Sequence, residues 1–204
     1  MVQFVFLGDS NWFFRDASYD AFPWNVLYTK QHVASFTAEH LQVPCHAFPL
    51  YQLDISEDNI TRLQSLISAV AMQQQPVSML LWIGQNTTWM LATSQHAHTN
   101  ADECKAKIKY KLLHFAHTIK LLGQFDTIYV IDYHDHPNMR DNSLYQMLNK
   151  FLIDNLVEML PAAQRITMID TTPDMYVDGT HLSRSSQEAI ARHIAHQVSS
   201  SCSS

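Results

Sequence analysis

The sequence predicts an α/β protein, a three-layer α/β/α sandwich in which helices cover both faces of a five-stranded parallel sheet. Short, almost entirely apolar runs suit strands buried on both faces, and they alternate with longer segments of helical apolar spacing. Strictly alternating strands and helices favour a parallel sheet. A chain of 204 residues fits one domain. We expect this domain to span residues 1–198, with the flavodoxin-like strand order 2-1-3-4-5.

The first part of the chain contains two expected strands and one expected helix. Residues Val2–Leu7 are nearly all apolar and predict a buried strand. Residues from Trp24 to Leu41 indicate a weakly patterned helix. Residues Val43–Leu50 predict a poorer strand, because Pro44 and Pro49 interrupt it.

A second helix and the most regular strand follow. Ser56 can cap a helix whose apolar residues recur at helical spacing, namely Ile60, Leu63, Ile67 and Val70. The run Val77–Ile83 predicts a central strand, and we expect a loop after it. Residues Ala101–Leu122 have an apolar stripe at helical spacing with Gly123 directly after it, which is typical of a helix and its C-terminal cap.

The last part of the chain continues the alternation. We expect strands at Asp126–Asp132 and Arg165–Asp170, and helices at Asn142–Leu160 and Ser183–Val198. Residues 199–204 are mostly serine and predict a flexible tail outside the domain. In total, the pattern predicts five strands and five helices.

Composition excludes several classes of protein. Thirteen Lys and Arg against 19 Asp and Glu give a net charge of −6, so the whole chain has no electrostatic attraction to nucleic acid or anionic membranes. No apolar run approaches ~18 residues, which a membrane span requires. Cys45, Cys104 and Cys202 form no CxxC pair and indicate a reducing, cytoplasmic setting. Four glycines cannot form a dinucleotide-binding or Walker A loop, and we expect no cofactor.

Polar residues follow two of the expected strands and precede the last helix. Strand 1 ends in Gly8-Asp9-Ser10-Asn11 and strand 3 ends in Gly84-Gln85-Asn86-Thr87. In open α/β sheets, ligands bind beyond the carboxyl ends of the strands, at the point where the strand order reverses. Strand order 2-1-3-4-5 puts that point between strands 1 and 3. Ser10 and Asn86 should therefore face each other across a crevice.

The segment Asp178-Gly179-Thr180-His181 supplies the remaining groups for acyl transfer. A serine hydroxyl needs a general base, and histidine can take its proton and return it to the leaving group. Asp178 can fix the tautomer of His181 and stabilise its charged form. The amide of Asn86 is a neutral donor that suits a transient oxyanion.

These three motifs, in this order and at the ends of these strands, resemble blocks I, III and V of the SGNH/GDSL hydrolases. The resemblance extends from about Val2 to Val198. It implies that Ser10 is the nucleophile, His181 the base and Asp178 its orienting acid. It also implies an oxyanion hole formed by the Ser10 backbone N–H, the Asn86 side chain and a block II glycine N–H.

The chain departs from the family pattern at two positions. The segment Leu53-Asp54-Ile55-Ser56 resembles the block II sequence G-D-x-S, so Leu53 takes the place of the glycine. Its N–H can still complete the oxyanion hole, but we expect its side chain to project where glycine permits close approach. Thr87 replaces the aspartate that often follows the block III asparagine.

The resemblance implies a serine esterase that acts on small carboxylic esters with acetyl or other short acyl groups. Asn11, Trp12, Thr87 and Trp89 follow the motifs and are candidates for substrate contacts. The alternative is a catalytically weak or inactive, hydrolase-like binding module, as in the RNA-binding Oskar-type domain. A third interpretation is an acyltransferase, which keeps the chemistry but uses an acceptor other than water. Loss of the block II glycine favours the binding module. The intact side chains of Ser10, Asn86, Asp178 and His181 oppose it, and so does the net charge of −6, which also argues against nucleic-acid binding.

Two further clusters have simpler interpretations. Asp132, His134, Asp135 and His136 could ligate a metal, but their spacing matches no metal motif, and we expect a polar loop at the rim of the site and no metal. Lys105, Lys107, Lys109 and Lys111 form the basic cluster of the chain. We expect a solvated helix margin there, with a phosphate-binding patch as the alternative.

Overall fold

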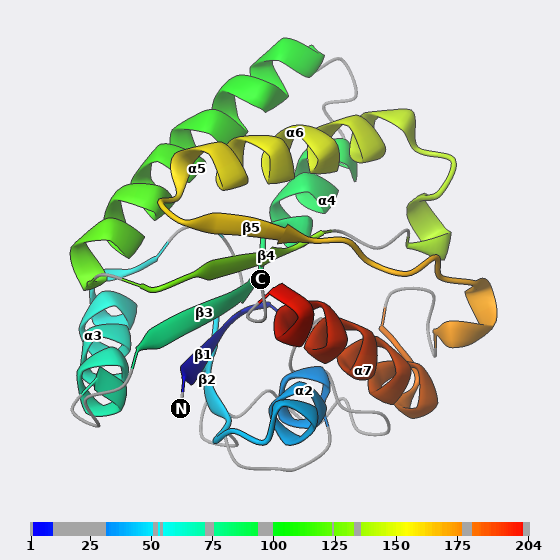
Figure 1. Cartoon of the computed structure of the whole chain (residues 1–204). Helices are drawn as coiled ribbons and strands as arrows, with labels where there is room; N and C mark the ends of the chain where they lie inside the picture. Colours follow the sequence, from blue (N-terminus) through cyan, green and yellow to red (C-terminus); the bar gives the residue numbers. More distant parts are fainter. Residues whose placement is uncertain are drawn as a thin grey trace.

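The computed structural model has one parallel sheet between two layers of helices (Figure 1). The structure describes residues 2–9, 32–50, 53, 55–71, 76–93, 100–123, 125–132, 136–176 and 181–201. The strands are β1 Gln3–Gly8, β2 His46–Pro49, β3 Val77–Trp82, β4 Ile128–Ile131 and β5 Ala163–Ile166. Their order is β2-β1-β3-β4-β5 and every pairing is parallel, which confirms the predicted fold class and strand order.

The helices divide between the two faces of the sheet (Figure 1). One face is covered by α3 Glu57–Ala71, α4 Gln85–Thr93, α5 Ala101–Leu122 and α6 Ser143–Met159. The other face is covered by α2 Val33–Leu41 and α7 Arg184–Ser201, which pack against each other. Two short 3-10 helices, η1 Pro137–Met139 and η2 Pro173–Met175, follow β4 and β5. Every described helix is too short or too polar to span a membrane.

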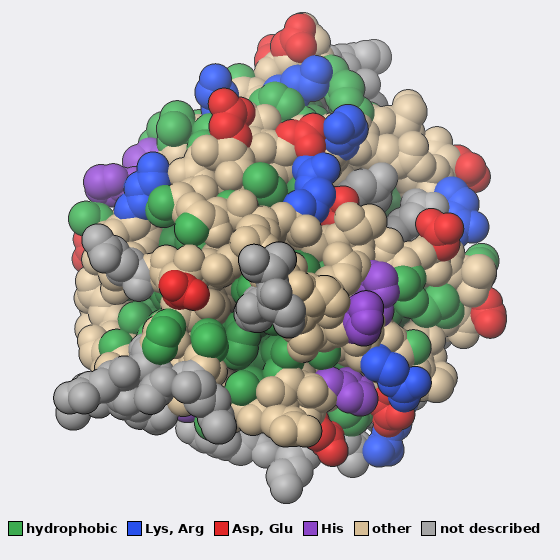
Figure 2. All heavy atoms as spheres, viewed as in Figure 1, with side chains coloured by type: hydrophobic (Ala, Val, Ile, Leu, Met, Phe, Trp, Pro, Cys, Tyr) green, Lys and Arg blue, Asp and Glu red, His purple; other side chains and the backbone are tan. Residues whose placement is uncertain are grey.

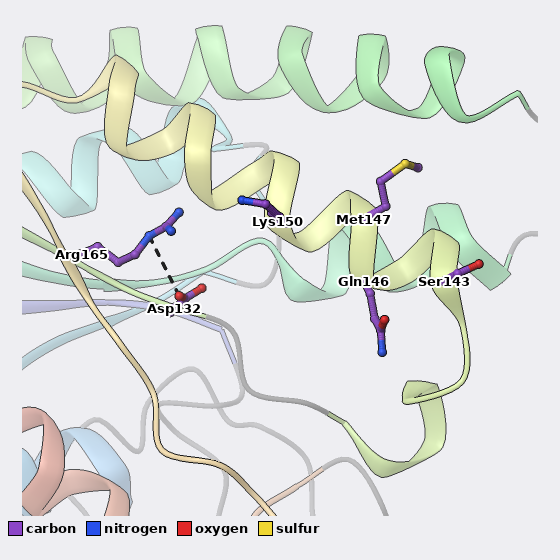
Figure 3. Close-up of a pocket in the computed structure, with 6 residues that line it drawn as sticks. All are labelled: Asp132, Ser143, Gln146, Met147, Lys150 and Arg165. Atoms are coloured by element: carbon purple, nitrogen blue, oxygen red, sulfur yellow. Dashed lines mark ion pairs between the residues drawn. The ribbon is translucent and has the colours of Figure 1, made fainter.

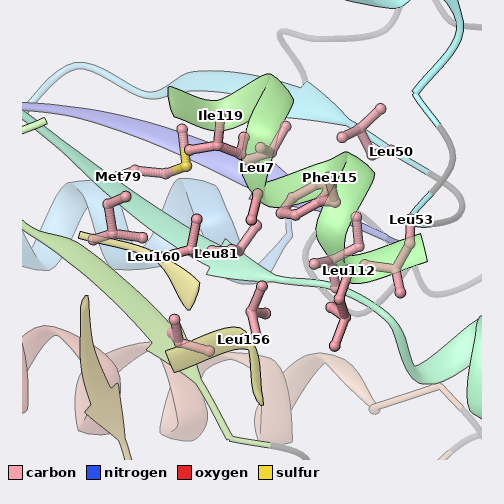
Figure 4. Packing of buried hydrophobic residues seen from close by; sticks show 14 of the residues in the cluster. Leu7, Leu50, Leu53, Met79, Leu81, Leu112, Phe115, Ile119, Leu156 and Leu160 are labelled. Atoms are coloured by element: carbon pink, nitrogen blue, oxygen red, sulfur yellow. The ribbon is translucent and has the colours of Figure 1, made fainter. Parts of the chain in front are cut away.

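Successive residues of the central strands serve two separate cores, because side chains alternate across a sheet. Val5 and Leu7 of β1 pack under α3, α5 and α6, in the cluster drawn in Figure 4. Phe4 and Phe6 pack on the other face, with α2 and α7. β1, β3 and β4 are buried along their whole length, as their continuous apolar sequences predict.

Side-chain caps explain where several helices begin, and the cap at Ser56 was predicted from the sequence. The side chain of Asn100 accepts a hydrogen bond from the backbone N–H of Asp102 at the start of α5 (3.1 Å). Asn142 accepts one from the N–H of Tyr145 at the start of α6 (2.9 Å). Ser56 accepts one from the N–H of Asn59 in α3 (3.3 Å). Each side chain satisfies a donor that the first helical turn leaves without an intrahelical partner.

Some predicted boundaries were wrong. The fifth strand is Ala163–Ile166 rather than Arg165–Asp170, because its only neighbour, β4, offers four residues for pairing. It is an edge strand in which only Ile166 is buried, so apolar periodicity marks it poorly. The second strand is confined to His46–Pro49. The last helix continues through Ser201, three residues past its predicted end at Val198.

One predicted helix is described only in part, and one predicted loop is a helix. Of the helix expected between Trp24 and Leu41, the described part is Val33–Leu41, and residues 24–31 lie outside the described residues. The loop expected after the third strand is instead the helix α4. Its sequence contains three threonines and a tryptophan, which have only modest helix propensity. Packing of Gln85, Thr87 and Thr88, all buried, accounts for this helix better than propensity does.

Gly84 connects β3 to α4 in a conformation that other residues rarely adopt. Its φ is +103°, in the left-handed half of conformational space that favours glycine. A Cβ atom at this position would lie 2.6 Å from Cδ1 of Leu152 in α6. The close approach of Leu152 and the backbone angle therefore both require glycine here.

Replacing Gly84 with alanine should destabilise the fold by about 2–4 kcal/mol, from backbone strain plus the collision with Leu152. Gly123→Ala is the matched control, since its φ of +146° is also positive but a Cβ atom there would have no neighbouring atom within 4 Å. It should cost only about 1–2 kcal/mol in free energy of unfolding. Urea denaturation of both variants, and of Gly84→Ala in a Leu152→Ala background, measures the difference. Equal costs for the two glycines would contradict the collision with Leu152.

His46, the first residue of β2, should make stability depend on pH. Burial lowers its pKa below the ordinary value of 6.5, and no described residue hydrogen-bonds to its buried Nε2. The unfolded chain then binds a proton more readily, so the contribution is complete above pH 6.5 and is lost as pH falls below it. His46→Gln should flatten the decline in unfolding free energy between about pH 7 and 5. The control Ser68→Ala, at an exposed position on α3, changes no titratable group and should leave that slope unchanged.

Candidate active site

The first motif leaves the sheet between β2 and β3. The backbone N–H of Asp9 donates to the carbonyl oxygen of Trp82 in β3 (3.1 Å), and the N–H of Leu50 donates to the carbonyl oxygen of Gly8 (2.6 Å). Asp9 is buried. The next residues, 10–12, include the predicted nucleophile and two predicted substrate contacts and lie outside the described residues. The residue before Ser10 is thus fixed at the carboxyl end of β1.

The third motif forms the first turn of α4 at the same edge of the sheet. Gly8 and Trp82 are partners in the β1–β3 register, so the two motifs leave adjacent strands side by side, as predicted. Asn86 is half-buried in this turn. Thr87 is buried, which makes it a packing residue of α4 in this structure. Trp89 is half-buried one turn further on.

The fifth motif lies between two residues that pair with each other. Tyr176 and Leu182 form an isolated antiparallel bridge, and the N–H of Ser183 donates to the carbonyl oxygen of Met175 (2.8 Å). His181 directly precedes Leu182 and is half-buried. Residues 177–180, which include Asp178, lie outside the described residues. The start and end of this segment are therefore held together just before α7.

A buried histidine connects the flanks of the third and fifth motifs. His136 is 2% exposed, and its Nε2 lies 3.4 Å from Oε1 of Gln85, the neighbour of Asn86. Its ring centroid lies 6.1 Å from that of Tyr176 and 5.9 Å from that of Trp89. The sequence predicted a polar loop at the rim of the site, and His136, just before η1, is buried there beside Gln85. His134 and Asp135 lie outside the described residues.

Trp89 belongs to the same cluster. Its ring is edge-on to His136 and to Tyr145 of α6, with a centroid separation of 6.0 Å from Tyr145. These contacts bury part of the ring, and because the side chain is only half-buried, the rest of it is exposed to solvent. Edge-to-face arrangements are favoured between aromatic rings. On α4, the ring of Trp89 is therefore packed on one side by His136 and Tyr145.

Leu53 lies in the hydrophobic core. Its side chain is 1% exposed and belongs to the cluster that contains Leu50, Leu112 and Phe115 (Figure 4). We expected this side chain to project where a glycine would let another group approach the backbone closely. It points into the hydrophobic core instead. The side chain contributes apolar burial instead, which explains why leucine is tolerated at this position.

The turn that carries Asn86 is also held from α6. The Thr88 hydroxyl lies 2.5 Å from Oδ1 of Asn149 and 2.9 Å from the carbonyl oxygen of Gln85, and all three residues are buried. Asn149 lies on the buried face of α6, where its neighbours, such as Leu148 and Leu152, are apolar. A polar residue within such a stripe is a sequence signal for a buried hydrogen bond, and the sequence prediction overlooked it.

A separate polar hollow of about 490 Å³ lies beside α6 at the β5 edge of the sheet (Figure 3). It is lined by Asp132, Ser143, Gln146, Met147, Lys150 and Arg165. Arg165 reaches Asp132 (4.0 Å) and Asp154 (2.5 Å). Hydrogen bonds from Lys150 and Arg165 hold the pKa of the Asp154 carboxyl below its usual value.

The charges in this hollow compensate one another. Asp132, considered above as a metal ligand, faces the guanidinium of Arg165 (Figure 3). Within the described parts of the chain, no three His, Cys, Asp or Glu residues come close enough to hold a metal ion. The structure therefore gives this hollow an ion-pair network and no metal-ligating cluster.

Solved structures similar to this chain share its architecture. A lipolytic protein of the G-D-S-L family from Veillonella parvula superposes with a TM-score of 0.59 at 11% identity, over 97% of this chain and 98% of the other. Est24, a carbohydrate acetylesterase from Sinorhizobium meliloti, gives 0.55 at 14% identity over 97% and 99%. The inhibitor-bound aryl esterase of M. smegmatis gives 0.52 at 14% identity, also over 97% and 99%.

The chain has the fold of the SGNH/GDSL hydrolases, as the resemblance in the sequence implies. No protein-family model matches the sequence, and no curated protein matches it either. Identities of 11–14% establish shared architecture, and the role of each residue has to be argued from this chain itself.

The contact between Thr88 and Asn149 should be strongly non-additive in stability. Thr88→Val removes the hydroxyl and leaves the buried Asn149 amide without it, which should cost about 1–3 kcal/mol. Asn149→Leu in the same chain removes the polar group and should recover much of that loss. A double-mutant cycle of unfolding free energies measures the coupling. Additive effects of the two substitutions would contradict a direct buried interaction.

Proposed function

We propose that this protein is a serine esterase that hydrolyses small carboxylic esters through an acyl-enzyme on Ser10. The observation that supports the proposal is that described residues next to the three motifs lie near one another. Asp9, next to Ser10, hydrogen-bonds to β3, and His136 contacts both Gln85, next to Asn86, and Tyr176, close to Asp178. Three segments far apart in the sequence thus meet at one edge of the sheet, where this fold class binds ligands.

The proposed reaction proceeds in two acyl transfers. Ser10 Oγ attacks the ester carbonyl carbon while His181 accepts the hydroxyl proton. The tetrahedral intermediate collapses, the C–O bond to the alcohol breaks, and His181 returns the proton to the departing alcohol. Water then attacks the acyl-enzyme with His181 again as base, which releases the acid and restores Ser10. In this scheme Asp178 holds His181 and stabilises its charged form, and no cofactor is required.

The proposed oxyanion hole consists of the backbone N–H groups of Ser10 and Leu53 and the side-chain amide of Asn86. Asn86 lies in the first turn of α4, where the positive end of the helix dipole favours negative charge nearby. Burial of the Leu53 side chain in the core is compatible with an N–H role, because the side chain is occupied elsewhere. It also weakens the argument for an inactive binding module, which was based on the missing glycine.

Small substrates fit this proposal best. The similar structures are described as a carbohydrate acetylesterase, an aryl esterase and a lipolytic protein, which share ester hydrolysis and differ in the alcohol. We propose Asn11 and Trp12, which follow the nucleophile in the sequence, as substrate contacts. We propose that the half-buried ring of Trp89 also contacts the substrate. Thr87 is a weaker candidate than the sequence suggested, because its side chain is buried.

The test is turnover of p-nitrophenyl acetate and labelling by a fluorophosphonate probe. Ser10→Ala should abolish labelling and, like His181→Gln, lower kcat by at least about 10⁴-fold. Asn86→Ala should lower kcat by about 10²–10³-fold while leaving probe labelling detectable. Ser68→Ala and His40→Gln, at exposed positions on α3 and α2, are matched controls that should retain full activity.

Circular dichroism and urea denaturation establish that each variant folds. Full activity of a folded Ser10→Ala variant would overturn the proposed nucleophile. A folded wild-type protein that neither turns over the ester nor reacts with the probe would favour the binding module instead.

A further inference from the structure

The outward side of α5 is unusually apolar for a solvated helix. Three of the four large hydrophobic side chains that stand out as exposed in the described part of the chain lie on it: Tyr110 (65%), Leu113 (53%) and Leu121 (68%). The fourth, Met90, lies on α4. Single exposed apolar residues are common, but a row of them on one helix indicates an interaction surface.

The spacing of these residues places them along one face. Tyr110, Leu113, His117 and Leu121 follow each other at intervals of three or four, opposite the buried stripe that includes Ile108 and Leu112. The ring of Tyr110 also stacks edge-on with His114, at a centroid distance of 4.5 Å. We name Tyr110, Leu113, His114, His117 and Leu121 the outer stripe of α5.

Lysines lie on both sides of the outer stripe. At 100° per residue, Lys109 and Lys120 fall on one side of it, and Lys107 and Lys111 on the other. Within the described residues, Lys107, Lys109 and Lys120 form no ion pair. α5 has five lysines against two acidic residues, a net charge of +3 in a chain of net charge −6. Along the upper left edge of Figure 2, where α5 lies in Figure 1, basic, acidic, histidine and hydrophobic side chains are interleaved.

The apolar outer stripe and the lysines on both sides of it together indicate what kind of partner binds α5. A second copy of α5 would bring two lysine-rich helices together, which like-charge repulsion opposes. An anionic lipid surface instead offers apolar chains for the leucines, an interface for the amphipathic tyrosine ring, and phosphates for lysines on both sides. We propose that the outer stripe of α5 and its flanking lysines dock the protein on the surface of anionic membranes.

The proposal is independent of the esterase chemistry. The outer stripe lies on the side of α5 that faces away from the sheet, whereas the candidate active site lies at the carboxyl ends of β1 and β3. Vesicle binding can therefore be measured without turnover, and loss of one property does not imply loss of the other.

The test is co-sedimentation of the full chain with vesicles of phosphatidylcholine alone or with 30% phosphatidylserine. We expect binding to the anionic vesicles only, and weaker binding as salt is raised from about 50 to 500 mM, because salt screens the lysines. Lys107→Gln/Lys109→Gln should weaken partitioning by at least about tenfold, since each lysine near an anionic surface contributes about fivefold. Leu113→Gln/Leu121→Gln should also weaken it by about tenfold or more.

Matched controls remove the same chemistry elsewhere. Arg184→Gln/Arg192→Gln deletes two positive charges from exposed positions on α7, across the sheet, and Met90→Gln deletes an exposed apolar side chain from α4. Both should bind as the wild type does. Three results would overturn the proposal: no preference for anionic vesicles, equal losses in the α7 variant, or no vesicle binding together with α5-dependent binding of an acidic amphipathic peptide.

Discussion

The parallel pairing of β1 with β3 is the constraint on which the rest of the molecule depends. The two strands are paired from Gln3 and Val77 to Gly8 and Trp82, and both are buried on both faces. A shift of one residue would move every side chain to the opposite core, so burial on both faces fixes the register. The fixed register brings Asp9 and the Gly84 turn out of the sheet side by side, and Gly84 then directs the chain into α4.

The sequence predicts the elements whose patterns reflect their own burial. α5 was predicted with its observed bounds because its apolar residues recur at helical spacing and Gly123 directly follows the last of them. α4 was missed because its threonines favour no helix, and its buried polar residues have partners on α6 and at His136, far away in the sequence. The edge strand β5 was displaced because pairing with the short β4 sets its limits, and its own exposed residues do not.

The site was predictable to a similar extent. Strand order and motif position predict that the first and third motifs meet, since both follow buried parallel strands. The roles of His136 and Asn149 could not be predicted with the same argument, because their partners lie 51 and 61 residues away. Leu53 is the converse case. Comparison with a family pattern suggested a crowded site, whereas packing assigns its side chain to the core.

The charge on one face of a helix can be opposite in sign to the net charge of the whole chain. A net charge of −6 predicts no attraction to anionic surfaces, but electrostatic attraction near a membrane acts within about a Debye length and depends on the local face. The lysines of α5 appear in the sequence as a margin around a buried stripe. Only the fold reveals that α5 packs by one face, which leaves Leu113 and Leu121 exposed between those lysines. Both apolar stripes of α5 have the same helical spacing, one facing the core and one facing outward. The sequence pattern does not tell them apart, whereas their burial in the structure does.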